Sequence, residues 1–268
     1  HEGRAPALTF GSAAVIRPGS TRHNLARAVR GEAGFSLALQ LSPDELARLR
    51  ELVEAQWLGV IGRQAPEAVA AFRAAGIAHY HEHAATLPHA TLWPKAARIL
   101  PRAAAAEIRA MAFMEDLAGA FGPFTISDED EVGWQEIYWR LVRPGQPGDM
   151  GPLHADRWFW DLGHGTTPAG RERIKVWVAL VTEPGRSGLR VVPGSHRREW
   201  RFHGESRDGR LKPQIDEDEA ALGATLLATA PGDAVVFHDA LLHGGAPNRG
   251  TLTRVSLEFT LFVAPARS

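Results

Sequence analysis

The sequence of 268 residues is 44% hydrophobic and 23% charged, a composition typical of a folded globular protein. Its 30 Lys and Arg nearly balance its 31 Asp and Glu, so no overall charge favours nucleic acid or an anionic membrane as a partner. The absence of cysteine excludes disulfides, thiolate catalysis and Cys-ligated metal centres. No apolar stretch has the roughly 18 residues of a membrane span, and no signal-peptide core opens the sequence, so we expect a cytoplasmic protein.

The first predicted elements are a strand and a helix. Residues 34–40 form a short predicted strand. Ser42 and Glu45 then make a capping box, with Pro43 at the first helical position, where its missing N–H costs nothing. Apolar residues at helical spacing predict an amphipathic helix that ends near Trp57.

Two further helical stretches are predicted before the pattern changes. One covers residues 66–75 and is stopped by Gly76, and the other runs from Pro101 through an Ala-rich segment to Gly122. Helices therefore dominate residues 1–122.

Beyond this point the apolar period falls from about 3.6 residues to about 2, and β-branched and aromatic residues become frequent. The predicted strands cover residues 134–142, 174–181, 189–192, 234–237 and 255–263. Gly and Pro turns separate them, and no strong helix supplies parallel crossovers. We therefore predict a mainly β fold, an antiparallel jelly-roll or barrel over residues 124–264 with the N-terminal helices packed outside, in one domain of residues 1–268. Residues 207–219, which are rich in charge, are expected to form a surface loop.

His154 and Asp156 are candidates to bind one metal ion. They follow a loop where a strand is expected, and residues two apart on a strand point to the same side. The pair alone is a weak signal, because His-x-Asp arises often by chance. One more histidine would complete a triad of two His and one carboxylate, which is typical of non-haem Fe(II). The candidates for this third ligand are His164, His196, His203, His238 and His243.

A later segment, residues 231–248, strengthens the metal hypothesis. A Pro-Gly-Asp turn leads into an apolar strand, and His243 precedes two glycines that allow backbone to come close to a ligand. Arg254 then begins the last predicted strand. Its guanidinium suits the far carboxylate of 2-oxoglutarate, because it pairs bidentately and stays charged when desolvated. Ser256 would face the same side and could add a hydrogen bond.

Together these segments resemble the phytanoyl-CoA dioxygenase-like (PhyH-like) family of Fe(II)- and 2-oxoglutarate-dependent oxygenases. The matching motifs are LSPDEL at 41–46, HAD at 154–156, VWVALV at 176–181, SGLRVVPGSHR at 187–197, PGDAVVFHDALLHGGAPN at 231–248, and Arg254. The resemblance implies a double-stranded β-helix, with His154, Asp156 and His243 as iron ligands and Arg254 as the 2-oxoglutarate anchor. His238 competes for the third position, but the family's distal His is the one followed by Gly-Gly or Gly-Ser and then Pro-Asn.

The resemblance also implies the activity. With Fe(II), 2-oxoglutarate and O2, we expect hydroxylation of a small polar or anionic metabolite with release of succinate and CO2. Desaturation, cyclisation or epimerisation would begin from the same oxidant. Halogenating relatives replace the carboxylate ligand with a small residue, so Asp156 disfavours halogenation. The alternative is a catalytically silent β-barrel binding module, against which the intact set of motif residues counts.

Several charged and aromatic residues are candidates for substrate contact: Arg140, Arg157, Trp158, Lys175 and Trp177. Aromatic side chains with a few charged groups are the usual lining of a small-molecule site. The alternative is that these aromatics pack in the core. If one of the cations faces the cavity, the substrate carries a carboxylate, a phosphate or a similar acidic group.

Two other histidine motifs are interpreted as structural. His79, His81 and His83 alternate, but they lie among helices without a matching ligand, so an exposed or locally hydrogen-bonded cluster is favoured over a metal site. His196 is expected to serve a turn or to line the mouth of the pocket.

Overall fold

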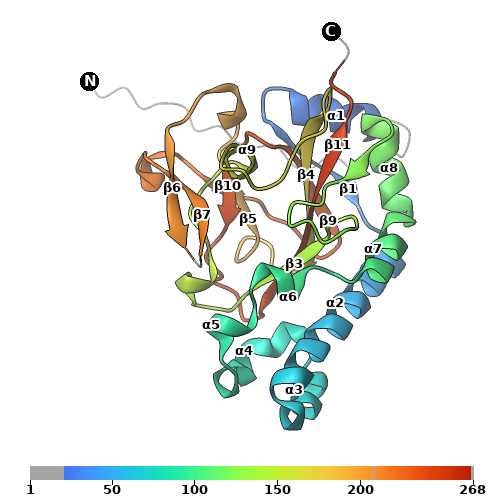
Figure 1. The fold of residues 1–268 in the computed structure, drawn as a ribbon, viewed down its shortest axis with the longest axis vertical. Coiled ribbons are helices and arrows are strands. Elements are labelled where there is room, and N and C mark those ends of the chain that lie inside the picture. The colour runs from blue at the N-terminus through green and yellow to red at the C-terminus, as the bar shows by residue number, and fades with distance from the viewer. Residues whose placement is uncertain (1–20, 208, 267–268) are drawn as a thin grey trace.

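The computed structural model describes residues 21–207 and 209–266, and its centre is a pair of facing β-sheets with helices on the outer face of the larger one (Figure 1). The large sheet contains β1 (Phe35–Gln40), β2 (Thr125–Ile126), β3 (Tyr138–Val142), β4 (Glu172–Val181), β9 (Asp233–His238) and β11 (Arg254–Val263). The small sheet contains β5 (Leu189–Val191), β8 (Thr225–Leu226) and β10 (His243–Gly245), and a separate hairpin joins β6 (Phe202–Arg207) to β7 (Arg210–Ile215).

Strand β11 occupies a central place in the large sheet, whose order is β1-β9-β4-β11-β2 with β3 also paired to β11. These pairs are antiparallel. The expected mainly antiparallel jelly-roll with flanking helices is therefore confirmed, as two sheets that face each other without closing into a barrel.

The two faces of the large sheet have different partners because side chains alternate along each strand. On β4, Ile174, Val176 and Val178 belong to the core shared with the helices. Trp177 and Ala179 point the other way and pack against the small sheet. This inner face is where the site residues gather.

The helices are α1 (Thr21–Arg30), α2 (Pro43–Gln64), α3 (Val69–Ala75), α4 (Tyr80–His83), α5 (His89–Leu92), α6 (Lys95–Arg98), α7 (Arg102–Arg109), α8 (Ala112–Phe121) and α9 (Asp156–Asp161). The capping box of Ser42 and Glu45 at the start of α2 is confirmed by both reciprocal hydrogen bonds. The helix continues past its expected end near Trp57, because Val60 and Ile61 are buried in the core and extend its apolar face. Figure 1 shows α2, α7 and α8 on one side of the sheets and the β6–β7 hairpin on the other.

Three further expectations are corrected. Residues 207–219 are not a long loop, since β7 pairs with β6 from Phe202↔Ile215 to Arg207↔Arg210. The third helical stretch breaks in two at Met111, whose backbone is extended. The strand expected from residue 134 begins only at Tyr138.

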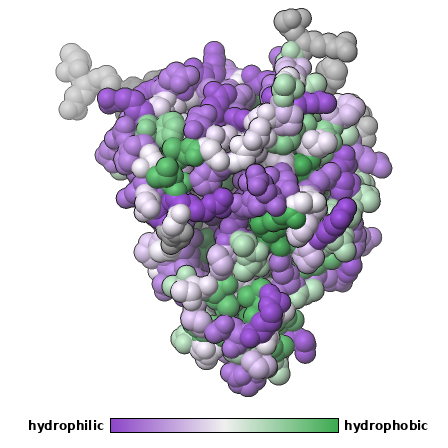
Figure 2. All heavy atoms as spheres, viewed as in Figure 1, coloured by the Kyte–Doolittle hydropathy of each residue, from purple (hydrophilic) through white to green (hydrophobic). Residues whose placement is uncertain are grey.

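The surface gives few signs of an apolar interface. On the face seen in Figure 2, hydrophilic residues predominate and the apolar patches are small. The large apolar residues that stand exposed in the described part of the chain are Leu37 and Leu211. Among the described residues, no helix is long and apolar enough to span a membrane.

Candidate active site

His154 and His243 lie side by side on two antiparallel segments. Their backbones form an isolated β-bridge, with N–H to carbonyl distances of 3.0 and 2.9 Å, and their ring centroids are 4.5 Å apart. The bridge therefore connects β10 of the small sheet to the segment that carries the HAD motif.

Both imidazoles are oriented by their own backbone. The Nδ1 of His154 donates to the carbonyl of Pro152 at 2.9 Å, and the Nδ1 of His243 donates to the carbonyl of Leu241 at 2.9 Å. With the proton on Nδ1, each Nε2 keeps its lone pair, which is the form that binds a metal.

Asp156 completes the group. Its Oδ1 lies 3.7 Å from the Nε2 of each histidine, and one ligand atom from each of the three residues falls within 4.8 Å of the others. The expected strand at this motif is wrong: His154 makes only an isolated β-bridge, Ala155 is extended, and Asp156 is the first residue of α9. The three side chains nevertheless converge, so they could hold one metal ion.

The charge state of the triad suits a divalent cation. Burial would raise the pKa of Asp156, but Lys175 and the two histidines hold it well below its usual value. Burial lowers the pKa of His243 to about 4. At neutral pH the group therefore offers a carboxylate and a neutral imidazole at these two positions.

Arg254 and Ser256 lie on the inner face of β11, as the sequence predicted, and both are buried. The Nε of Arg254 and the Oγ of Ser256 have no hydrogen-bond partner, and the Arg254 side chain has no ion pair among the described residues. Burial lowers the pKa of Arg254 to about 10, which leaves it charged at neutral pH. Because a buried, unpaired cation is costly, this pair lacks an anionic partner that a ligand carboxylate would supply.

A polar chain connects the triad to the neighbouring strands. Lys175, on β4, lies with its Nζ 3.5 Å from Asp156 Oδ2 and donates to the hydroxyl of Tyr138 at 3.0 Å. Tyr138 donates in turn to Glu258 at 3.0 Å, and Arg140 Nε is 3.2 Å from the other oxygen of Glu258. Arg140 retains 42% of its side-chain surface open, whereas Lys175 retains 3%, so Arg140 offers the accessible part of this wall.

Of the five residues predicted to contact substrate, three lie on the inner face of the large sheet and two lie on α9. Arg140, Lys175 and Trp177 lie on the inner face, and the Trp177 Nε1 is a buried donor without a partner. Trp158 is buried elsewhere: its ring stacks on Phe202 of the hairpin at 4.6 Å. Arg157, the neighbour of Asp156, lines a polar hollow at the edge of the inner face.

The remaining histidines lie outside the triad. His238 accepts a hydrogen bond from the backbone of Ala240, so the choice of His243 agrees with the geometry. His196, in the short 3-10 helix Ser195–Arg197, donates from Nε2 to the carbonyl of Gly31 at 3.0 Å. His79 contacts Glu82 and His81 contacts Thr253, which agrees with a locally hydrogen-bonded cluster.

Glu258 is the site residue that sequence reasoning missed. It follows Arg254 and Ser256 on β11 at the same two-residue spacing, so strand alternation placed it on the same face. The signal was present, but a lone glutamate in an apolar strand matched no motif.

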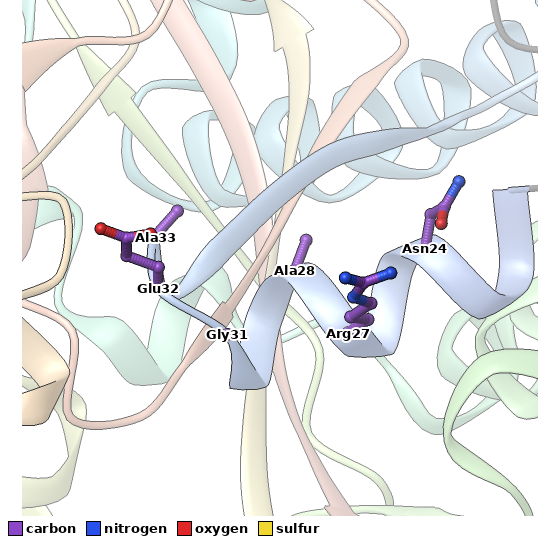
Figure 3. A pocket seen from close by; sticks show the side chains of 6 residues that line it. All are labelled: Asn24, Arg27, Ala28, Gly31, Glu32 and Ala33. Carbon is purple, nitrogen blue, oxygen red and sulfur yellow. The ribbon is translucent and has the colours of Figure 1, made fainter.

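A larger hollow of about 500 Å³ lies at α1 and the turn after it (Figure 3). It is lined by Asn24, Arg27, Ala28, Gly31, Glu32 and Ala33. One cation, one carboxylate and several small side chains present no group of residues that would select a ligand.

Comparison with known proteins identifies the family. The family model described as phytanoyl-CoA dioxygenase (PhyH) matches residues 32–256. The chain belongs to the PhyH family. The expected family is thus confirmed, together with its non-haem iron and 2-oxoglutarate-dependent oxygenase class. A search of curated proteins found no match.

Solved structures share the PhyH-like fold at low identity. EvdO2 from Micromonospora carbonacea var. aurantiaca is 20% identical with a TM-score of 0.57, and the match covers 97% of this chain and 96% of that chain. EctD from S. alaskensis, solved with 2-oxoglutarate and 5-hydroxyectoine, is 19% identical with a TM-score of 0.53, covering 95% and 79%. AviO1 from Streptomyces viridochromogenes Tue57 is 18% identical with a TM-score of 0.52, covering 92% and 98%. At these identities the likeness concerns the fold.

Proposed function

We propose that this PhyH-family protein is an Fe(II)- and 2-oxoglutarate-dependent dioxygenase that hydroxylates a small polar or anionic metabolite and releases succinate and CO2. The observation that carries the proposal is the buried, unpaired Arg254, which shares the interior with the triad of His154, Asp156 and His243. A module that only binds metal would not need a desolvated guanidinium. A dicarboxylate cosubstrate needs a metal ion for one end and a guanidinium for its far carboxylate.

Each residue has a proposed role. His154, Asp156 and His243 would hold Fe(II), a donor set of two imidazoles and one carboxylate that is typical of non-haem iron oxygenases. Arg254, with Ser256 beside it, receives the far carboxylate of 2-oxoglutarate. The bound metal and cosubstrate supply the oxidant that removes hydrogen from an unactivated C–H bond, while the protein supplies orientation and a dry interior. Because Asp156 is a carboxylate within the triad, we do not propose halogenation.

We propose that the substrate lies against the polar wall of the inner face. The Nζ of Lys175 and the open side of the Arg140 guanidinium offer donors to an acidic group, and Trp177 offers an indole N–H beside an apolar ring. We also propose residues 1–268 as one oxygenase domain, because the helices and the large sheet share a core.

The test is anaerobic titration of metal-free protein with Fe(II) and 2-oxoglutarate, following the weak visible charge-transfer band of their chelate. We expect the band in wild type, a much higher 2-oxoglutarate requirement in Arg254→Ala with partial recovery in Arg254→Lys, and no band in His243→Ala. Arg73→Ala, an exposed arginine on α3, serves as the matched control. Absence of the band in wild type at saturating iron would overturn the proposal and favour a catalytically silent binding module.

A further inference from the structure

A second polar hollow, of about 200 Å³, lies beside the triad segments. It is lined by Arg157, Arg171, Glu172, Arg173, His238 and Asp239. The lining thus contains three guanidinium groups, one imidazole and two carboxylates. Whether the hollow can attract an anion depends on whether the two carboxylates are already neutralised by cations.

The hollow continues the inner face that carries the triad. Lys175 on β4 and Phe237 on β9 are register partners. Arg173 lies two residues before Lys175, and Asp239 lies two residues after Phe237, so both are on the same side of the sheet as Lys175. Two residues of strand span about 6–7 Å, so the hollow begins within that distance of the residue that contacts Asp156. The backbone N–H of Arg157 also donates to the carbonyl of Asp239 at 2.9 Å, which attaches α9 to the same rim.

Both carboxylates are already engaged. Asp239 is 2.6 Å from Arg173 Nη2, accepts from Arg173 Nε at 2.9 Å, and lies 3.2 Å from His238 Nδ1. Glu172 accepts from Arg30 Nε at 2.8 Å and pairs with Arg30 Nη2 as well. Each negative charge in the lining therefore has a dedicated cation.

Two guanidinium groups remain with free donors. Arg157 contacts Asp239 only at 3.6 Å and keeps 45% of its side-chain surface open. The exposed Arg171 side chain has neither a hydrogen bond nor an ion pair within residues 21–207 and 209–266. Each guanidinium nitrogen of Arg173 has a partner, since Thr167 accepts from Nη1 and Asp239 lies beside Nε and Nη2. The hollow thus offers the free N–H donors of Arg157 and Arg171, while its two carboxylates are neutralised by Arg173 and Arg30.

We propose that this hollow binds an oxyanionic group of the substrate, a phosphate ester or a carboxylate, through Arg157 and Arg171. Planar guanidinium forks match such oxyanions bidentately. Water occupies roughly 30 Å³ per molecule, so the volume admits a phosphate with part of its attached group. The assignment of the anion to the substrate rests on the proposed oxygenase function, and the existence of the anion site does not.

The experiment titrates inorganic phosphate into metal-free, full-length protein by calorimetry at constant ionic strength. We expect saturable binding in wild type and in the Arg73→Gln control. Each of Arg157→Gln and Arg171→Gln removes one guanidinium and its charge-assisted hydrogen bonds, and should weaken phosphate binding roughly tenfold or more. Binding should vanish in the double variant. Arg171→Lys should bind phosphate more tightly than Arg171→Gln but less tightly than wild type, because lysine restores the positive charge without the bidentate donors of the guanidinium. No saturable binding in wild type, or equal binding in wild type and the double variant, would overturn the site.

A phosphate monoester such as phenyl phosphate tests the source of the anion. Binding at least as tight as that of inorganic phosphate, with the same loss in the double variant, supports an anion that belongs to a larger molecule. Exclusion of the monoester while inorganic phosphate binds would show a site for the free ion and would overturn the substrate assignment. Because iron and 2-oxoglutarate are absent from this titration, its failure is distinct from loss of the charge-transfer band.

Discussion

Lys175 is the side chain that joins the metal-binding group to the rest of the polar interior. It is 3% exposed and lies between Asp156 and Tyr138. Burial would lower its pKa, but Asp156 and Tyr138 raise it well above the ordinary value, so it is charged at neutral pH. In the metal-free protein, Lys175 is therefore a buried cation whose charge compensates the Asp156 carboxylate, 3.5 Å away.

Replacement of Lys175 by Met should destabilise the metal-free protein by about 3 kcal/mol, because it leaves Asp156 as a buried and uncompensated charge. Mn(II), as a redox-inert substitute for Fe(II), should restore more stability in Lys175→Met than it adds to wild type, since the metal replaces the lost positive charge. Urea unfolding with and without Mn(II) measures both effects. Arg73→Met, at an exposed position of α3, is the control, and equal metal-free stability of Lys175→Met and wild type would contradict the expectation.

At the scale of elements, the β6–β7 hairpin packs against α9 through a small apolar cluster. Phe202 stacks on Trp158 with 4.6 Å between ring centroids and an angle of 10°, and His164 Nε2 lies 2.6 Å from the carbonyl of Leu211. Most side chains of β6 are exposed. The stack of Phe202 on Trp158 is therefore one of the apolar contacts that attach the hairpin, together with the buried Ile215.

Phe202→Ala should accelerate hydrogen exchange of the amides in β6 and β7 while the amides of β4, β9 and β11 keep their protection, because local opening costs less free energy than global unfolding. Exchange followed by mass spectrometry resolves the two regions. Leu211→Ala truncates an exposed residue of the same hairpin and should change neither. Uniform acceleration across both sheets would show that the hairpin is part of the global cooperative unit.

Asp149 joins three elements by its carboxylate. It accepts from the Arg143 backbone N–H at 2.9 Å and from its guanidinium at 2.9 and 2.8 Å, and His89 Nε2 of α5 lies 3.2 Å away. Burial would raise the pKa of Asp149, but Arg143 and His89 hold it below its ordinary value of 3.8. A carboxylate whose folded pKa is lowered stabilises the fold above the unfolded pKa, and the contribution is lost as the pH falls through the folded pKa.

Asp149→Asn should therefore cost about 1–3 kcal/mol in the free energy of unfolding near neutral pH, by loss of charged hydrogen bonds. The difference from wild type should shrink as the pH is lowered from 3.8 toward the folded pKa of Asp149. Urea unfolding at neutral pH and at successively lower pH values checks the sign. A difference that is constant over this acid range would mean that the ionised form is not what stabilises the contact.

The elements also show what the sequence could and could not predict. The capping box and the alternation of β4 and β11 are local patterns, and they placed α2 and the inner face. The third member of the triad, His243, came from the family resemblance and not from local spacing. The β6–β7 hairpin was missed because polar residues cover most of β6, so alternation gave no signal there. Arg140 lies on the inner face beside Glu258, whereas Arg157 lines the polar hollow. This difference depends on the tertiary structure, which local spacing does not encode.

At the scale of the whole molecule, the triad joins distant parts of the chain. Asp156 begins α9, whereas His243 lies on β10 of the small sheet. A metal bound by both therefore stabilises the folded state and not the unfolded chain.

Mn(II) at about 100 times its dissociation constant should raise the free energy of unfolding by about 2.7 kcal/mol. Thermal unfolding of wild type with increasing Mn(II) measures the shift, and His243→Ala should lose it because one of three ligands is gone. Chelation should return wild type to its metal-free midpoint. An equal shift in His243→Ala would place the stabilising ion elsewhere.

The central position of β11 constrains when this protein can fold during its synthesis. β2 and β3 both pair with β11, and β4 gains its second neighbour only from it. A ribosome-bound chain that has not yet exposed residues up to Val263 therefore lacks the strand that joins most of the large sheet. Until that strand has emerged, the apolar face of the N-terminal helices stays uncovered, and this face would be a binding site for a chaperone.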